Sequence, residues 1–189
     1  MYQKEVVRLI KEMQKRPEIR NKEQQAYYHK IDDYINMPKT ESFHSSEKYY
    51  GALFHELVHS TGHKERLDRR ELIQSKGFKT EDYAVEELTA EMGASYLKSL
   101  SGIPIEQLEN NVAYIQGWLE RLKNDKKFIV YASTQAQKAT DYILNIRNQE
   151  KEPEPIEQIE REFEKSDDRE RELYKINQKR GKKSIEINR

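Results

Sequence analysis

One short segment of the chain carries two histidines and a glutamate at a spacing that suits metal chemistry. It reads His55-Glu56-Leu57-Val58-His59, the pattern HExxH. On an α-helix, positions i and i+4 lie on one face about one turn apart, so both imidazoles can reach one ion. The glutamate beside the first imidazole can then act as a general base toward water. We predict that His55 and His59 bind Zn²⁺ and that Glu56 is catalytic.

A catalytic zinc needs a third protein ligand and an open position for water. In the pattern HExxHxxGxxH, the glycine would fall at Gly62 and the third histidine at position 65. Gly62 fits, but position 65 is a glutamate and His63 stands two positions early. Glu65 is therefore one candidate for the third ligand, and a glutamate from a later helix is the other.

That later segment reads Glu86-Glu87-Leu88-Thr89-Ala90-Glu91. Glu87 and Glu91 are four residues apart and share a helix face, which Glu86 does not share with Glu87. Small residues near this face, such as Ala90 and Gly93, allow a close approach to the HExxH helix. We assign Glu87 as the third ligand and Glu91 as an acceptor for a ligand imidazole N–H, and the reverse assignment stays open.

Hydrolysis of a peptide bond also needs a donor for the charge that develops on the carbonyl oxygen. His63, Tyr83 and Tyr114 are candidates that the sequence does not rank. We interpret His29 and His44 as surface residues or as partners in local hydrogen bonds.

The elements that must position these residues are mostly helical. Apolar periodicity predicts helices from about Val6 to Met13, from Ser45 or Ser46 to Thr61, from Thr80 to about Gly102, over Val112–Leu122, and over Phe128–Ile146. Aromatic and β-branched residues on both sides of an Asp pair predict a hairpin over Ala26–Met37. The fold class is therefore α+β, mainly helical with a small antiparallel sheet.

Composition limits the remaining possibilities. Of the 189 residues, 36% are charged, against a typical value of about 25%, and 34 basic residues balance 34 acidic ones. No apolar stretch approaches the length of a membrane span, and the chain has no cysteine, which fits a cytoplasmic protein and leaves histidine and carboxylate as zinc ligands. We predict a domain over residues 1–147 and a charged, disordered or loosely helical tail over residues 148–189.

The motifs of the core, in their order along the chain, resemble those of the zincin-like metallopeptidase domain of ArdC-type antirestriction proteins. Plasmids, phages and integrated mobile elements carry such proteins. The resemblance rests on Ala26-Tyr27-Tyr28, Asp33-Tyr34-Ile35-Asn36-Met37-Pro38, the residues 55–63, the residues 83–91, Tyr114-Ile115-Gln116-Gly117-Trp118-Leu119, and Ala139-Thr140-Asp141-Tyr142-Ile143.

The resemblance implies a gluzincin-like site, with His55, His59 and a Glu of the later helix binding zinc, and an antirestriction setting. Full-length members usually carry an N-terminal single-stranded-DNA-binding domain, which is missing ahead of the first helix here, so we do not expect DNA binding by this chain alone. We expect a peptidase acting on a protein or peptide substrate. The alternative is a metal-stabilised, non-catalytic module that binds DNA or a host defence protein.

Overall fold

The computed structural model describes residues 2–74, 80–103, 116–117, 120 and 126–146, and every structural statement below concerns these residues. The predicted helix over Val112–Leu122, with Tyr114 and Trp118, and the tail over residues 148–189 fall almost wholly outside them. The elements in chain order are α1 (Tyr2–Glu12), β1 (Glu18–Arg20), β2 (Tyr27–His29), β3 (Tyr34–Asn36), the short 3-10 helix η1 (Thr40–Ser42), α2 (Ser46–Thr61), α3 (Arg70–Gln74), α4 (Glu81–Leu100) and α6 (Lys126–Ile143).

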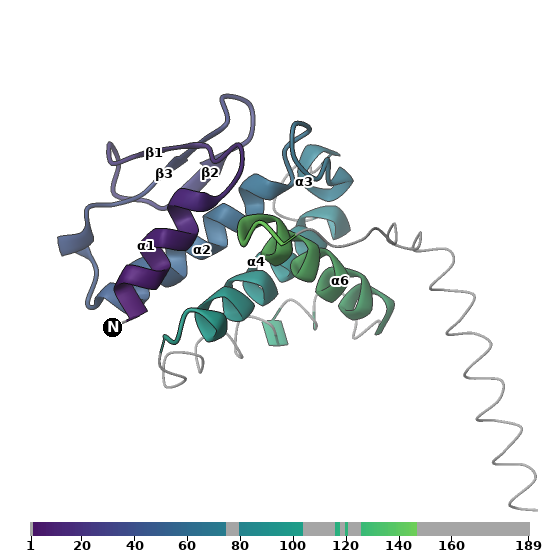
Figure 1. Ribbon diagram of the computed structural model, residues 1–189. Coiled ribbons are helices and arrows are strands. Elements are labelled where there is room, and N and C mark those ends of the chain that lie inside the picture. The colour runs from purple at the N-terminus through teal and green to yellow at the C-terminus, as the bar shows by residue number, and fades with distance from the viewer. Residues whose placement is uncertain (1, 75–79, 104–115, 118–119, 121–125, 147–189) are drawn as a thin grey trace, which may run out of the picture. The chain divides into compact units, whose positions relative to one another are not determined.

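Helix α2 is the central element of the fold (Figure 1). It packs against β2 and β3 on one side and against α4 and α6 on the other. Its apolar residues Phe54, Leu57 and Val58 are fully buried in the main core, together with Ile35 and Met37 of the sheet region. The helix that carries HExxH is therefore held from both sides, which keeps its polar side chains in place.

Local signals set the starts of α2 and α4 as the sequence predicts. Ser45 Oγ accepts a hydrogen bond from the backbone N–H of Lys48, and Thr80 Oγ1 accepts one from that of Tyr83. Each hydroxyl satisfies one of the amide groups that the first helical turn leaves without a partner. In each cap the hydroxyl and the N–H that it accepts from lie three residues apart in the chain, which is why the sequence predicts both caps.

The sheet has three short strands in the order β1-β3-β2. The predicted hairpin is confirmed, because β2 pairs with β3 antiparallel, with Tyr28 opposite Ile35. The expectation of a wholly antiparallel sheet is wrong, because β1 pairs with β3 in parallel, with Ile19 opposite Ile35. A strand of three residues has too little alternation to reveal its partner. The order leaves β2 at an edge of the sheet, beside α2.

Helices α2 and α4 are each followed within two residues by a glycine. Gly62 follows α2 in a right-handed conformation with φ −74°, so its backbone does not require glycine. Gly102 has φ +73°, the left-handed region that glycine adopts without strain, just after α4. Within the described parts, no helix is long and apolar enough to cross a membrane.

Candidate metal centre

The two predicted histidine ligands project from one face of α2, one turn apart. The Nε2 atoms of His55 and His59 lie 3.0 Å from each other, and the two ring planes meet at 79°. Two nitrogens that each bind one tetrahedral zinc at 2.0–2.1 Å lie about 3.3 Å apart. The imidazoles therefore already stand close to the separation that a shared ion requires.

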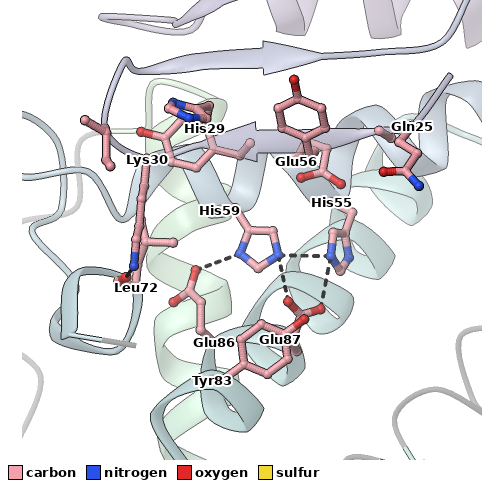
Figure 2. A pocket seen from close by; sticks show the side chains of 14 residues that line it. Gln25, His29, Lys30, His55, Glu56, His59, Leu72, Tyr83, Glu86 and Glu87 are labelled. Carbon is pink, nitrogen blue, oxygen red and sulfur yellow. Dashed lines mark hydrogen bonds and ion pairs between the residues drawn. The ribbon is translucent and has the colours of Figure 1, made fainter. Parts of the chain in front are cut away.

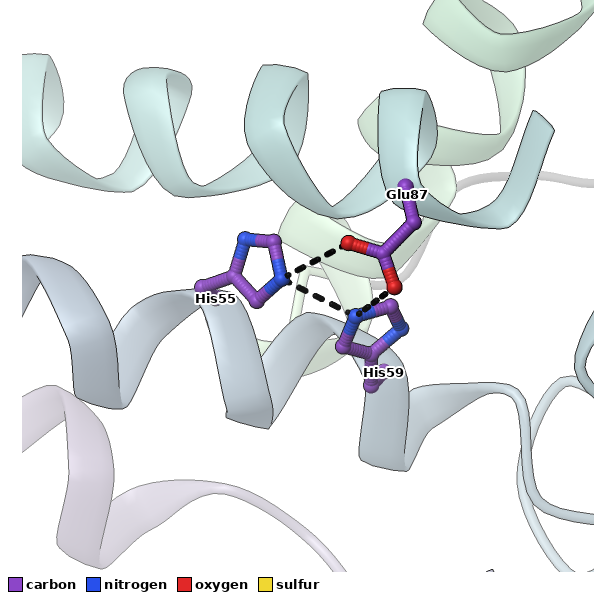
Figure 3. Close-up of side chains that lie close together, drawn as sticks. All are labelled: His55, His59 and Glu87. Atoms are coloured by element: carbon purple, nitrogen blue, oxygen red, sulfur yellow. Dashed lines mark hydrogen bonds and ion pairs between the residues drawn. The ribbon is translucent and has the colours of Figure 1, made fainter. Parts of the chain in front are cut away.

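Glu87 reaches the same point from α4, on the far side of the two rings (Figure 3). Its Oε2 lies 3.5 Å from His55 Nε2 and its Oε1 lies 3.6 Å from His59 Nε2. One ligand atom from each of the three residues lies within 4.8 Å of the others. Two imidazoles and one carboxylate are the donor set of a catalytic zinc site with an open fourth position, so the residues present fit this metal.

The charges at this cluster favour a cation. Burial by itself would raise the pKa of the Glu87 carboxyl, but the hydrogen bond to His55 and the charges of both imidazoles lower it to about 2. Burial would likewise lower the pKa of His55, yet Glu87, Glu91 and Glu56 hold it well above its ordinary value. Carboxylates thus outnumber the positive groups around the rings, and a divalent cation supplies the charge that protons would otherwise supply.

A carboxylate stands behind each imidazole. Glu91 Oε1 lies 3.4 Å from His55 Nδ1, on the side of the ring away from the cluster. Glu86 Oε1 lies 3.0 Å from His59 Nδ1, although Glu86 does not share a helix face with Glu87 and was not predicted to contact a ligand. The helix twist that separates these two neighbours places Glu87 in front of the rings and Glu86 behind His59. Such outer partners fix the orientation of metal-ligating histidines.

The cluster opens into a cleft of about 620 Å³. One wall consists of residues 25–31, which include β2, and α4 contributes Tyr83, Glu86 and Glu87 to the opposite side. Figure 2 shows Glu56 projecting toward β2, between the strand and the two histidines. The site therefore lies between the edge of the sheet and the glutamate helix.

The remaining predicted residues are distributed unevenly. His63 is not among the cleft-lining residues, and its Nδ1 accepts a hydrogen bond from the backbone N–H of Glu65. The Glu65 side chain is 62% exposed and pairs with Lys15 at 3.9 Å, away from the cluster. Tyr83 lines the cleft, whereas Tyr114 lies outside the described residues. The structure thus brings together His55, Glu56, His59, Glu87 and Tyr83.

Sequence reasoning passed over two residues of the cleft. The sequence contains a sign of the role of Glu86, because this acid directly precedes the proposed ligand Glu87 on α4. Neighbouring positions of that helix can both reach α2, where Glu86 contacts His59. His29 lines the cleft from the β2 wall and stacks on Tyr34, with ring centroids 5.0 Å apart. Its Nδ1 accepts a hydrogen bond from the Asp32 backbone N–H, so the predicted local hydrogen bond is present. Its place in the cleft depends on the sheet order, which the sequence does not reveal.

An HExxH helix that faces a glutamate-bearing helix, beside a small sheet, is the arrangement of the zincin class. The family model described as zincin-like metallopeptidase matches residues 5–135, more than half of the chain. The chain belongs to this family.

Two bacterial proteins are similar to about two thirds of the chain. The chain is 34% identical over 126 residues to "Uncharacterized protein y4eC" of Sinorhizobium fredii, a match that covers 67% of this chain and 40% of that protein. It is 35% identical over 119 residues to "DNA primase TraC" of Escherichia coli, covering 63% of this chain and 8% of that protein. The chain thus spans less than half the length of these relatives.

Solved structures agree with the family. The Mn(II)-bound crystal structure of the antirestriction protein ArdC from plasmid R388 superposes with a TM-score of 0.61 at 41% identity, covering 78% of this chain and 54% of that one. Its metal-free structure gives a TM-score of 0.57 at 38% identity, covering 76% and 52%. The resemblance to ArdC-type proteins is confirmed, as is the mainly helical α+β fold.

Proposed function

We propose that the chain is a zinc-dependent peptidase in which His55, His59 and Glu87 bind the metal and Glu56 is the general base. The observation that supports this most is the state of Glu56. Its carboxylate lines the cleft, and within the described parts of the chain it takes no hydrogen bond or ion pair. A purely structural glutamate that is only 8% exposed is usually hydrogen-bonded. A general base, by contrast, needs its lone pairs free for water.

Zinc is the metal that we propose, because two imidazoles and a carboxylate favour it. Imidazole nitrogens suit zinc, whereas carbonyl, carboxylate and water oxygens suit manganese and magnesium, and affinity rises from Mn²⁺ toward Zn²⁺ for most such sites. The ArdC crystal form that contains Mn(II) supports a site for a divalent cation in a relative. Metal analysis of the purified chain distinguishes the two metals.

Each residue of the site has a separate role in the proposed hydrolysis. When bound, zinc polarises the scissile carbonyl and lowers the pKa of an attacking water. Glu56 accepts a proton from that water as the new C–O bond forms, and it then delivers this proton to the amine as the C–N bond breaks. Tyr83 is the described candidate best placed to donate to the carbonyl oxygen, because it lines the cleft and hydrogen-bonds Glu87, while His63 lies outside the lining.

The substrate that suits this cleft is an extended polypeptide. The β2 strand pairs with β3 on one side only, so its outer backbone edge faces the cleft without a strand partner among the described residues. An extended peptide can add to such an edge through main-chain hydrogen bonds. The relatives suggest the setting of a mobile element, in which the target would be a host or plasmid protein, and we propose no DNA contact by this chain alone.

Substitution of Glu56 separates a peptidase from a binding module. Glu56→Gln keeps the size of the side chain and leaves the three ligands intact, but it removes the base. We expect unchanged zinc content and a loss of cleavage of unfolded protein substrate by about 10²- to 10⁴-fold. Glu65→Gln is the matched control, since this exposed glutamate lies away from the cleft, and it should behave as the parent chain.

Two results would overturn the proposal. Cleavage that survives in zinc-loaded Glu56→Gln would mean that another group is the base or that a contaminant cleaves the substrate. A zinc-loaded parent chain without cleavage, paired with a Glu56→Gln variant that protects incoming DNA as well as the parent does, would favour the non-catalytic binding module.

A further inference from the structure

A buried arginine joins the end of α2 to α4. Arg69 lies between α2 and α3 and is 3% exposed. Its Nε donates to Glu86 Oε2 at 2.9 Å and its Nη2 donates to Glu86 Oε1 at 2.6 Å. The same guanidinium donates to Thr61 Oγ1 at 2.6 Å and to the Val58 carbonyl oxygen at 2.8 Å. This paired arrangement fixes the plane of the carboxylate as well as its position.

Gly62 provides the space that this guanidinium occupies. A Cβ added at Gly62 would lie 3.0 Å from Nη2 and 3.1 Å from Cζ of Arg69. The φ of −74° at Gly62 is open to any residue, so the glycine is not explained by backbone conformation. The close approach of Arg69, together with that of Leu72 Cδ2 at 2.9 Å, explains it instead.

Glu86 passes this constraint to a metal ligand. The Oε1 atom that accepts from Arg69 Nη2 is the atom that stands 3.0 Å from His59 Nδ1. A carboxylate can only accept, so Nδ1 of His59 carries the proton and Nε2 keeps its lone pair for the metal. Both oxygens of Glu86 accept hydrogen bonds from Arg69, at 2.9 Å and 2.6 Å, so the carboxylate presents an acceptor to His59.

We infer that Arg69 is a positioning residue for the metal centre, which holds the Glu86 carboxylate against His59 Nδ1 and so aims His59 Nε2 at the point shared with His55 and Glu87. This inference rests on the proposed metal site. Arg69 acts on the ligand side chains through Glu86, and its only other contact with a ligand residue in the described chain is from Nη2 to the His59 carbonyl oxygen, at 3.5 Å.

A second arginine of the same loop supplies the matched control. The Arg66 side chain is 1% exposed, against 2% for that of Arg69. It donates to the Ser60 carbonyl oxygen, and it binds the Asp33 carboxylate and the Tyr28 hydroxyl of the hairpin. In the described parts of the chain its bonds reach neither Glu86 nor the two histidines. Loss of Arg66 therefore removes a comparable buried network without touching the partner of His59.

The experiment compares four variants of the full chain: Arg69→Met, Arg66→Met, Glu86→Gln, and the double variant Arg69→Met with Glu86→Gln. Zinc affinity is measured by competition with a chromogenic chelator, and ¹⁵N NMR of the metal-free protein reports which His59 nitrogen carries the proton. We expect Arg69→Met to weaken zinc binding by about 10- to 100-fold and to mix the two His59 tautomers. Arg66→Met should lower thermal stability yet keep the parent affinity and tautomer.

The double variant tests whether Arg69 acts through Glu86. Arg69→Met alone leaves a buried carboxylate without its cation, whereas the double variant leaves a neutral amide whose oxygen still accepts from His59. We expect it to recover most of the lost affinity. If Arg69→Met does not fold, Arg69→Lys keeps the charge without the forked geometry and should show an intermediate loss.

Three results would overturn the inference. One is a parent-like affinity and tautomer in Arg69→Met, and another is an equal loss in Arg66→Met, which would make both arginines merely structural. The third is a double variant that binds no better than Arg69→Met. A parent chain that binds no zinc would instead refute the proposed function, while the tautomer measurement would still decide the role of Arg69.

Discussion

Adding one methyl group at the contact between α2 and α4 should damage the metal centre from a distance. Gly93 is buried on α4, and a Cβ there would lie 2.8 Å from Cγ2 and 3.1 Å from Cγ1 of Val58. Val58 is fully buried, and its branched side chain has few alternative rotamers. To restore ordinary contact, the helices must separate by roughly 0.6 Å. Val58 directly precedes His59, and Gly93 lies about 9 Å along α4 from Glu87.

Two opposing effects determine how much Gly93→Ala changes the free energy of unfolding. Overpacking of a tight core costs about 1–3 kcal/mol, and replacing glycine by alanine within a helix returns about 1 kcal/mol. We expect a net loss near 1 kcal/mol, which lowers Tm by about 2–4 °C in a domain of this size. Because such a site tolerates displacements of only about 0.5 Å, zinc affinity should fall by about tenfold, in the range of other mutations that disturb ligand orientation.

Denaturant unfolding and zinc competition measure the two effects. Gly117→Ala is the control, because Gly117 is helical and exposed and an added Cβ there meets nothing within 4 Å. This control should stabilise the chain by about 0.5–1 kcal/mol and leave zinc binding unchanged. Val58→Ala combined with Gly93→Ala removes the clash and should restore part of the affinity. If Gly93→Ala is as stable as Gly117→Ala and binds zinc like the parent, close helix contact does not position Glu87.

Three further predictions concern pH, buried polar bonds and the metal. Burial would raise the pKa of Asp33, but Arg66 and Tyr28 lower it overall, so its stabilisation is present above an unfolded pKa of about 3.9 and disappears as pH falls through the lower folded value. Asp33→Asn should flatten this acid-side slope in urea midpoints measured from pH 7 to pH 3, and an unchanged slope would contradict it. Tyr131→Phe removes a 2.9 Å bond to Glu71 Oε1, while Glu71 Oε2 already lacks a partner among the described residues, so calorimetry should show a loss of about 1 kcal/mol. Removing the metal with a chelator should lower Tm, and zinc at 100 times its Kd should restore about 2.7 kcal/mol; a Tm indifferent to zinc would argue against a bound ion in the folded chain.

Signals that act over one or two helical turns were readable from the sequence. The HExxH spacing, the caps at Ser45 and Thr80, and the four-residue spacing of Glu87 and Glu91 each involve neighbours on a single element. The cluster of His55, His59 and Glu87 could therefore be predicted by placing one face of α2 against one face of α4. Small residues such as Gly93 indicated which face of α4 lies against α2.

Contacts that depend on how distant segments close on one another were not readable. Arg69 meets Glu86 across 17 positions, and nothing in the local pattern distinguishes it from other charged residues of its loop. The parallel pairing of β1 with β3 was missed because Ile19 stands in a strand of only three residues. Helix α3 was missed because five residues show too little periodicity. Long-range pairing, rather than local preference, decides each of these features.

Among the described residues, the outer edge of β2 has no strand partner, and such an edge can promote aggregation as well as peptide binding. Unpaired strand edges are templates on which further copies of a chain can stack into aggregates. Here the edge strand has only three residues, Tyr27–His29, and charged Lys30, Asp32 and Asp33 follow it directly. A short edge bordered by charge discourages stacking between identical chains, since like charges would meet at every repeat. An edge of this length can still pair with a few residues of one extended peptide, so binding a substrate strand and avoiding self-association do not conflict.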